Sequence, residues 1–352
     1  MQFHHLSHID LDGYGCQLVS TEFFKNSASL YFYNANYGKE VMARISQIIA
    51  NIKKSKDKDA LILISDLNLT LNECEELSKE VLDLNLAGFS VKYELLDHHK
   101  SGQECADKYP WYILDTKRCA TKIVYETLAS RYALSDEIKA WLEPMVTMIN
   151  SIDLWLENGY NFEFGKVAMR LVVEAKELNR FMFDDADRDY KLALLRESAK
   201  FLAQEKGHIL LDNAVLELKK NYLNGSLMSD TLDNLASFYQ VGLLEKKAEF
   251  CTIYYGKYRG FLSYSIGSIS VLANLFLKQN PDFDFFMDVN FRGNVSLRAN
   301  NKCDVSLLSK KCFNGGGHPN ASGGKIEGFK ESFLYSEIKA SIEEVFLKVE
   351  NE

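Results

Sequence analysis

Three short apolar segments in the N-terminal part of the chain are each followed by acidic and histidine residues. Phe3–Leu6 precedes the run His8-Ile9-Asp10-Leu11-Asp12-Gly13, Ala60–Ile64 precedes Ser65-Asp66, and Val91–Leu96 precedes Asp97-His98-His99. Helix-like stretches lie between these segments, at Tyr14–Phe24, Lys39–Lys54 and Thr70–Ala87. Alternation of strands and helices with short connections predicts a mainly parallel, doubly wound α/β sheet. Ligands bind such a sheet outside the carboxyl ends of its strands, so the acidic clusters should converge there.

Convergence of these side chains would bring several carboxylates together. The carboxylates concerned are those of Asp10, Asp12, Asp66 and Asp97. They would repel one another at neutral pH unless their pKa values rise or cations neutralise them. His8 and His98 add nitrogen ligands, which favour Mn²⁺, Zn²⁺ or Fe²⁺ over a simple Ca²⁺ or Mg²⁺ site. A ligand set of mostly carboxylates with a minority of imidazoles suits Mn²⁺ best, with Mg²⁺ or Co²⁺ as substitutes. A site with this many ligands holds two metal ions more easily than one, so we expect two Mn²⁺ ions with Asp66 as a bridging ligand.

Each of these motifs also has an ordinary structural interpretation. An Asp that follows a strand usually caps the next helix. Adjacent histidines are usually exposed, and we predict that His4 and His5 in the first strand lie on the surface. Three Asp/His clusters at three strand ends are difficult to explain in this way, which favours a metal site.

A glycine-rich segment near the C-terminal end, Asn314–Gly324, predicts a loop that holds an anion. Its consecutive residues Gly315, Gly316 and Gly317 would let backbone N–H groups converge without clashes between Cβ atoms. Such a concave group of donors binds phosphate or carboxylate, and His318 adds a donor beside it. A simple flexible loop is the alternative interpretation.

Together, and in this order, the motifs resemble the DHH phosphoesterase superfamily. The matching residues are His8, Asp10, Asp12 and Gly13 in the first motif, Asp66 in the second, Asp97-His98-His99 in the third, and Asp153 in the fourth. The C-terminal part resembles the DHH-associated domain, in which Val295–Arg298 precedes the glycine-rich segment. Among the subgroups, the chain is most similar to short-oligonucleotide hydrolases of the nanoRNase or oligoribonuclease B type. It is also similar to phosphatases that act on 3′-phosphoadenosine 5′-phosphate.

The resemblance implies a role for each of these residues. It assigns His8, Asp10 and Asp66 to one metal ion, and Asp12, Asp66, His98 and Asp153 to the other. It makes Asp97 a partner that orients His98, and it directs His99 at the substrate phosphate. It places Arg298, His318 and the amides of Gly315, Gly316 and Gly317 on the substrate from the opposite wall of the cleft. Catalysis would be attack by a hydroxide that the two metal ions share, with contributions from Asp10, Asp12, Asp66, His98 and His99.

Changes of pattern along the chain predict three parts. Residues 1–164 form the catalytic metal-binding domain, residues 165–247 a helical connector, and residues 248–352 a smaller α/β domain that ends in a helix. In the last part we expect strands at Phe250–Tyr255, Phe283–Val289, Asn294–Arg298 and Gly324–Ile326, and helices at Leu262–Leu277, Val305–Cys312 and within 331–352. The polar residues within Phe261–Leu277 favour a packed helix over a membrane span.

The net charge of −8 over 352 residues restricts the substrate. Proteins that grip long nucleic acid usually carry a basic face, because phosphate neutralisation provides much of the affinity. We therefore expect no long duplex partner and no membrane. We expect instead a small phosphorylated nucleotide or an oligoribonucleotide of about 2–5 residues, cleaved to nucleoside 5′-monophosphates. The seven cysteines form no C-x-x-C pair and the start lacks the features of a signal peptide, so we expect a cytoplasmic location.

Several other functions stay open at this stage. They are a phosphatase for 3′-phosphoadenosine 5′-phosphate, a phosphodiesterase for cyclic or linear dinucleotides, a pyrophosphatase, a RecJ-like single-strand DNA exonuclease, and an inactive nucleotide sensor. The exonuclease is disfavoured because the sequence has neither an added oligonucleotide-binding barrel nor a basic face with interleaved aromatic residues. The inactive sensor is disfavoured because every motif position is filled.

Overall fold

The computed structural model describes residues 1–267 and 269–350. One residue of the predicted helix Leu262–Leu277 and the last two residues of the predicted segment 331–352 therefore lie outside the described residues. The chain divides into two compact units. Unit 1 comprises Met1–Ala175 and Arg188–Leu218, and unit 2 comprises Lys176–Asp187 and Lys219–Glu352. The three-part division inferred from the sequence stays a prediction.

Unit 1 is built on a parallel sheet of five strands. They are β1 (Gln2–Ser7), β2 (Ser29–Asn34), β3 (Asp59–Ser65), β4 (Ser90–Asp97) and β5 (Tyr112–Leu114), in the order β2-β1-β3-β4-β5. Every neighbouring pair of these strands is parallel, which confirms the predicted doubly wound sheet. The strand order reverses direction between β1 and β3, and the carboxyl ends at such a point form a crevice that binds ligands.

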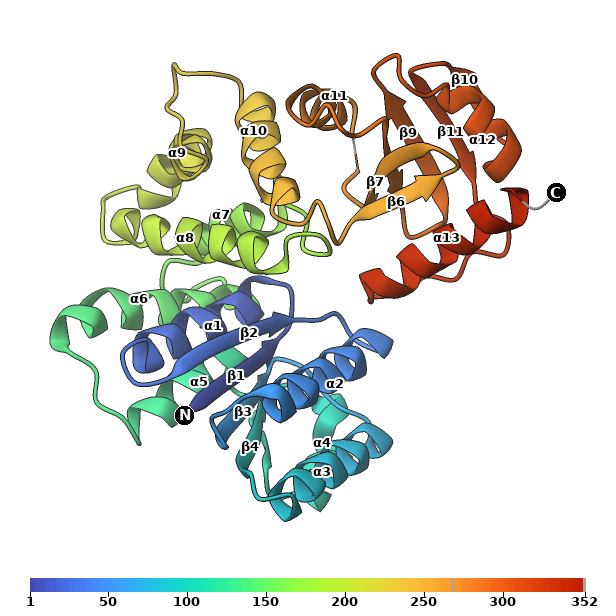
Figure 1. Cartoon of the computed structure of the whole chain (residues 1–352). Helices are drawn as coiled ribbons and strands as arrows, with labels where there is room; N and C mark the ends of the chain where they lie inside the picture. Colours follow the sequence, from blue (N-terminus) through green and yellow to red (C-terminus); the bar gives the residue numbers. More distant parts are fainter. Residues whose placement is uncertain (268, 351–352) are drawn as a thin grey trace. The chain divides into compact units, whose positions relative to one another are not determined.

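Helices cover both faces of this sheet (Figure 1). On one face lie α1 (Leu11–Phe24), α5 (Ala120–Ala129), α6 (Asp136–Asp153) and α7 (Phe162–Val173). On the other lie α2 (Lys39–Lys54), α3 (Leu71–Leu86) and α4 (Gln103–Lys108), the last preceded by the short 3₁₀ helix η1 (Lys100–Gly102). Leu63 packs toward the first layer and Ile62 and Ile64 toward the second, so the central strands are apolar on both faces.

Two helices that follow the sheet of unit 1 in the sequence contain residues of both units. α8 (Asp184–Leu202) and α9 (Gly207–Tyr222) are helices within the segment 165–247 that was predicted to be helical, and α10 (Leu232–Glu245) lies in unit 2. The sequence analysis missed β2, β5 and the helices α4, α5 and α6. No described helix is long and apolar enough to cross a membrane.

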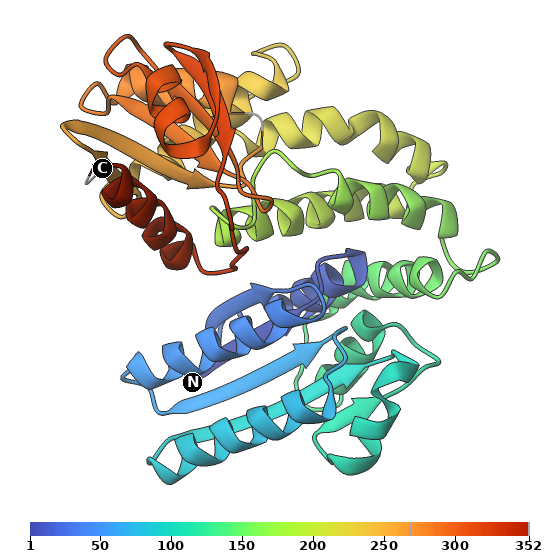
Figure 2. The ribbon, with the colours of Figure 1, turned by 90° about the vertical axis from the view of Figure 1, so that its right-hand side faces the viewer.

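Unit 2 contains a mixed sheet of six strands. They are β6 (Thr252–Tyr255), β7 (Tyr258–Tyr264), β8 (Phe285–Val289), β9 (Asn294–Ala299), β10 (Gly316–His318) and β11 (Ala321–Lys325), in the order β10-β11-β9-β8-β7-β6. Only the pair β7–β8 is parallel among these described strands. The helices of this part are α11 (Ser270–Gln279), α12 (Val305–Phe313) and α13 (Tyr335–Glu350), and Figure 2 shows α13 beside the sheet.

Two predicted elements of unit 2 are wrong. The predicted helix Leu262–Leu277 is divided between strand β7 and helix α11, because Ser265 and Gly267 adopt positive φ angles of 58° and 96° that interrupt a helix. The predicted loop of the glycine-rich segment is mostly a hairpin, in which β10 pairs with β11. Its closing strand therefore starts at Ala321 and not at Gly324.

Candidate metal centre

The first side chains of the site lie in the turn from β1 into α1. Asp10 is the N-cap of α1, where its Oδ1 accepts a hydrogen bond from the amide of Gly13 at 3.0 Å. A Cβ atom at position 13 would overlap the carbonyl oxygen of His8, so only glycine permits this close approach. Asn34, at the end of β2, donates to the same carbonyl at 3.0 Å. The turn thus holds His8 and Asp10 in a fixed relation.

Replacing Gly13 with alanine should therefore displace His8 and weaken metal binding. Loss of a residue that only supports a ligand typically reduces metal affinity by about 10- to 100-fold, and we expect a loss in this range. Calorimetric titration with Mn²⁺ measures it. The matched control is Gly242→Ala, because a Cβ atom there meets open space in helix α10 and should leave the affinity unchanged. Equal affinity in Gly13→Ala and the parent protein would contradict this account of the turn.

Asp66 occupies the end of β3 with a left-handed backbone, φ 57°, and is only 1 % exposed. Its Oδ2 atom accepts no hydrogen bond from any described residue. Burial, together with the charges of Asp12 and Asp10, raises the pKa of Asp66 well above its usual value. A buried carboxylate oxygen without a donor is costly, and a bound cation would remove that cost.

The end of β4 supplies two imidazoles with different environments. His98 Nε2 lies 3.3 Å from Asp66 Oδ1 and 3.7 Å from Asp12 Oδ2, and its Nδ1 lies 3.7 Å from Asp153 Oδ2. Burial lowers the pKa of His98, which keeps the ring neutral and able to bind a metal. His99 Nδ1 lies 2.8 Å from Asp97 Oδ1, and this hydrogen bond raises the pKa of His99.

The partner of Asp97 is thus His99 and not the predicted His98. Asp97 is fully buried, and its second oxygen accepts a hydrogen bond from the Tyr112 hydroxyl at 2.9 Å. Successive residues of an extended chain point to opposite sides, so Asp97 and His99 share a side. Asp97 therefore fixes the ring of His99.

Asp12 and Asp153 complete the acidic cluster. Both oxygens of Asp12 accept backbone hydrogen bonds at the start of α5, from the amides of Ala120 at 2.7 Å and Thr121 at 2.8 Å. Asp12 consequently fastens the start of α5 while still facing His98. Burial and the charges of Asp12 and Asp10 raise the pKa of Asp153, the last residue of α6, to about 8. In Asp10, by contrast, burial is outweighed by the contacts with His8 and Gly13, which lower its pKa to about 2.

Three groups of side chains could each hold a metal ion. They are His8, Asp10 and Asp66; Asp12, His98 and Asp153; and Asp66, His98 and His99, with the ligand atoms of each group within 4.8 Å of one another. The first two groups lie within the predicted ligand sets, and Asp66 and His98 each belong to two groups. The third group gives His99 a metal-facing position that the sequence analysis did not predict. Carboxylate and imidazole donors around an unsatisfied buried oxygen fit a divalent first-row metal ion.

Tyr37 is a member of the site that the sequence analysis missed. Its ring centroid lies 4.7 Å from that of His8 and 5.8 Å from that of His99, and its hydroxyl lies 3.2 Å from His99 Nε2. Because His99 Nδ1 is engaged by Asp97, Nε2 of the neutral ring accepts from Tyr37. Tyr37 follows β2. Recognising that strand in the sequence would have placed Tyr37 at the carboxyl ends of the strands, beside the other residues of the site.

His4 and His5 are buried, which corrects the prediction that they lie on the surface. His5 lies between Ser20 and Ser65, with ring nitrogens 2.7 and 2.8 Å from their hydroxyls. Burial lowers the pKa of His5 to about 3 and that of His4 to about 4, so both rings stay neutral. They are polar members of the core beneath the acidic cluster.

Arg298 and His318 lie in one row of the sheet of unit 2. Both are register partners of Ala321, Arg298 on β9 and His318 on β10. Directly paired residues point to the same face, so the two cationic or polar side chains flank a small residue there. The guanidinium of Arg298 also donates to Ser270 Oγ, at the start of α11, at 2.9 Å. The row therefore places an arginine and a histidine on one face of the sheet.

The neighbouring glycines have a packing role that the sequence analysis did not foresee. A Cβ atom at Gly315 would overlap the carbonyl oxygen of Gly323, and one at Gly324 would lie 2.6 Å from Cβ of Phe313. The amide of Gly315 donates to the carbonyl of Ser309 at 3.1 Å and so is not directed at a ligand. Position 316 is open, and Gly317 has a φ of 148°.

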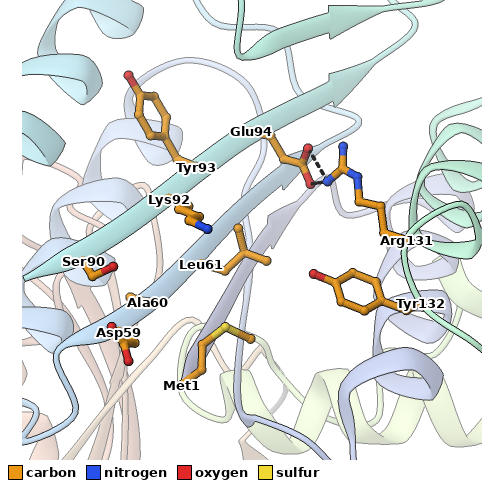
Figure 3. Close-up of a pocket in the computed structure, with 10 residues that line it drawn as sticks. All are labelled: Met1, Asp59, Ala60, Leu61, Ser90, Lys92, Tyr93, Glu94, Arg131 and Tyr132. Atoms are coloured by element: carbon orange, nitrogen blue, oxygen red, sulfur yellow. Dashed lines mark hydrogen bonds and ion pairs between the residues drawn. The ribbon is translucent and has the colours of Figure 1, made fainter.

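A cavity of about 570 Å³ lies in unit 1 at the end of the strands opposite the metal centre. Met1, Asp59 and Ser90 line it at the amino ends of the strands, as Figure 3 shows. Arg131 and Glu94 also line it and form an ion pair 2.8 Å long at one side. None of the metal-binding or catalytic residues predicted from the sequence lines this cavity, so the cavity is separate from the metal centre.

Curated proteins and solved structures are similar to this chain over most of its length, and no family model matches it. A protein of Helicobacter pylori (strain ATCC 700392 / 26695) named 3′,5′-cyclic-nucleotide phosphodiesterase is 57% identical over 347 residues, which cover 98% of this chain and 99% of that protein. Oligoribonuclease NrnB of Bacillus subtilis (strain 168) is 25% identical over 332 residues, covering 92% and 73% of the two chains. The crystal structure of an uncharacterized protein from Helicobacter pylori G27 is 56% identical, with a TM-score of 0.95 over 99% of each chain.

Proposed function

The chain belongs to the DHH phosphoesterase superfamily and is a metal-dependent phosphoesterase, and we propose that it hydrolyses the phosphodiester of 3′,5′-cyclic nucleotides. The observation that carries this proposal is the cluster of three potential metal groups, joined by Asp66 and His98, at the carboxyl ends of β1, β3 and β4. The relative named 3′,5′-cyclic-nucleotide phosphodiesterase favours the cyclic substrate over the other phosphoesters.

Short oligoribonucleotides are the second candidate substrate. The relative named oligoribonuclease supports them, and both substrates contain a phosphodiester that joins a 3′ and a 5′ oxygen of ribose. The net charge of −8 disfavours longer nucleic acid, because few phosphates could exchange their counterions for protein cations. We therefore propose cleavage of oligoribonucleotides of about 2–5 residues to nucleoside 5′-monophosphates as an accompanying activity.

We propose that the cofactors are two Mn²⁺ ions, with Mg²⁺ or Co²⁺ as substitutes. His8, Asp10 and Asp66 would hold one ion, and Asp12, Asp66, His98 and Asp153 the other, as the potential metal groups suggest. When bound, such ions polarise the phosphoryl oxygens and lower the pKa of water.

The chain's own residues would orient these parts and the substrate. Asp97 and Tyr112 hold the His99 ring so that Nε2 faces Tyr37 and is available to a phosphate oxygen. In unit 2, we propose that Arg298 and His318 bind a second phosphate when the substrate is a short oligoribonucleotide.

A panel of phosphoesters assayed with Mn²⁺ tests the proposal. It comprises 3′,5′-cyclic AMP and GMP, RNA of two, five and twenty residues, 3′-phosphoadenosine 5′-phosphate, linear and cyclic dinucleotides, and pyrophosphate. We expect the highest kcat/KM on cyclic mononucleotides, lower values on RNA of two and five residues, and a steep fall at twenty residues. Added salt should weaken binding only modestly, since few phosphates are engaged.

Other outcomes would identify the alternatives. Equal rates on five and twenty residues with a steep salt dependence would favour a processive exonuclease. Activity confined to 3′-phosphoadenosine 5′-phosphate would favour the phosphatase. Absence of turnover on the whole panel with Mn²⁺, Mg²⁺ and Co²⁺ would overturn the proposed function.

A further inference from the structure

Trp155 is a large aromatic residue in a backbone conformation that such residues rarely adopt. It follows Asp153 by two positions, just after the C-terminus of α6, and has a φ of 54°. A positive φ is an outlier for a bulky side chain and is retained where the surrounding structure or function requires it. The side chain is 58 % exposed, so burial of the indole in the core does not account for it.

The backbone at this position forms a cap that ordinarily contains glycine. The amide of Trp155 donates to the carbonyl of Ile152 at 3.1 Å, and that of Leu156 donates to Ser151 at 2.7 Å. This pair of bonds is the Schellman arrangement, in which the residue at the position of Trp155 is usually glycine because it must be left-handed. Termination of α6 therefore does not require an indole, and the side chain should serve another purpose.

The indole is held in a defined orientation. Its ring meets Phe162, the buried first residue of α7, edge to face, with centroids 5.3 Å apart and an interplanar angle of 90°. The loop between them is tight, since the amide of Gly159 donates to Leu156 at 2.7 Å and a Cβ atom at Gly159 would lie 2.6 Å from Ser151 Oγ. A fixed ring with most of its surface exposed can bind a flat ligand without a large loss of side-chain entropy.

The backbone of Trp155 is close to the metal centre along the chain. The carboxylate of Asp153 lies 3.7 Å from His98 Nδ1, and two residues of chain span at most about 7 Å. This backbone span is comparable to the distance between the phosphate and the base of one nucleotide. A phosphate at the metal centre would therefore bring the attached base within reach of the indole.

We propose that Trp155 is a stacking platform for the base of the nucleotide whose phosphate lies at the metal centre. This inference rests on the proposed nucleotide phosphodiesterase function. Stacking on an aromatic ring is tolerant of sequence because every base has a π face. The platform should accordingly accept purines and pyrimidines, with selectivity due only to differences in stacking strength.

The first test compares variants of Trp155 in the metal-loaded full chain. In Trp155→Gly and Trp155→Ala we expect KM for a 3′,5′-cyclic nucleotide to rise by about 5- to 100-fold, because a base–aromatic contact is lost. kcat should change much less, since the contact is present in both the ground and transition states. Trp155→Phe should retain most of the affinity. The effect should diminish for an abasic ribose 3′,5′-cyclic phosphate, which has no base to stack.

Tyr132→Leu is the matched control. Tyr132 is also exposed, at 41 %, and also packs edge to face on a phenylalanine, Phe24, at 5.0 Å. It lies in the cavity at the opposite edge of the sheet, so its removal should leave KM unchanged. The melting temperatures of Trp155→Gly and Trp155→Ala test whether the left-handed backbone at this position favours glycine. Because glycine adopts this conformation without strain, Trp155→Gly should melt about 2–4 °C above Trp155→Ala.

The second test measures binding without turnover. The chain contains three tryptophans, Trp111, Trp141 and Trp155, and stacking of a base on Trp155 should quench part of their fluorescence. The quench on addition of nucleoside 5′-monophosphate should disappear in Trp155→Phe and persist in Trp141→Phe.

Quenching by a wild-type protein that hydrolyses no phosphodiester would support the platform and refute the proposed function. Turnover with unchanged KM and an unchanged quench in the Trp155 variants would overturn the platform and leave the function intact. A change of oligomeric state in Trp155→Gly would also overturn it, in favour of contact with a second copy of the chain.

Discussion

Replacing Asp66 with asparagine is expected to abolish metal-dependent hydrolysis. Asp66 belongs to two of the potential metal groups and offers a buried oxygen that no described residue satisfies. Loss of a residue that merely supports a metal ligand costs about 10- to 100-fold, so loss of a shared ligand should reduce kcat/KM by more than about 100-fold. Asparagine is preferable to alanine here because it tolerates the left-handed backbone, φ 57°, of this position.

Stability measurements distinguish loss of the metal from loss of the fold. Without metal, Asp66→Asn should melt at or above the wild-type temperature, because burial and the neighbouring charges of Asp12 and Asp10 disfavour the ionised carboxylate. Mn²⁺ should raise the melting temperature of the wild type and have much less effect on the variant.

Asp288→Asn is the matched control for the effect of neutralising a buried carboxylate. Asp288 lies in unit 2, where its Oδ1 accepts hydrogen bonds from Ser263 at 2.6 Å and from the amide of Ile266 at 3.1 Å. Burial raises its pKa to about 6, but it belongs to none of the three metal groups. This variant should keep the activity and the response to Mn²⁺. Substantial Mn²⁺-dependent turnover in Asp66→Asn would refute a shared metal ligand at position 66.

The parts of the site that could be predicted follow from the regular geometry of a parallel sheet. Such a sheet aligns the carboxyl ends of its strands, so the residues after β1, β3 and β4 had to meet if those strands existed. Tyr37 was missed for the same reason, because β2 was not recognised and its end therefore had no place in the sheet. An edge strand with partly exposed residues gives a weaker apolar signal than a central strand.

The choice of side-chain partners was less predictable than the positions of the strands. The sequence analysis paired Asp97 with the adjacent His98, whereas the extended backbone directs Asp97 and His99 to the same side. Applying strand alternation one residue beyond the strand would have given the observed pair. The glycine-rich segment has a different difficulty. A glycine needed for close packing, as at Gly315, cannot be distinguished by composition from one whose amide binds an anion.

Removing Arg298 or His318 should weaken substrate binding without loss of metal. Both side chains flank Ala321 on one face of the sheet in unit 2, with their backbones two strand spacings, or about 10 Å, apart. Loss of a charge-assisted contact to phosphate costs roughly 1.5–3 kcal/mol, so each alanine variant should lose about one to two orders of magnitude in kcat/KM on an oligoribonucleotide with more than one phosphate. The number of Mn²⁺ ions bound, measured by calorimetry, should not change.

The double variant and a surface control determine whether the two residues act on the same anion. If they bind one group together, the loss in Arg298→Ala combined with His318→Ala should be smaller than the sum of the two single losses, because the second deletion removes a contact already weakened. Arg292→Ala removes an exposed arginine from the turn before β9 and should leave kcat/KM within about twofold of wild type, since exposed charges contribute little. A strictly additive double variant would place Arg298 and His318 on separate groups, and loss of Mn²⁺ from either single variant would refute their assignment to the substrate.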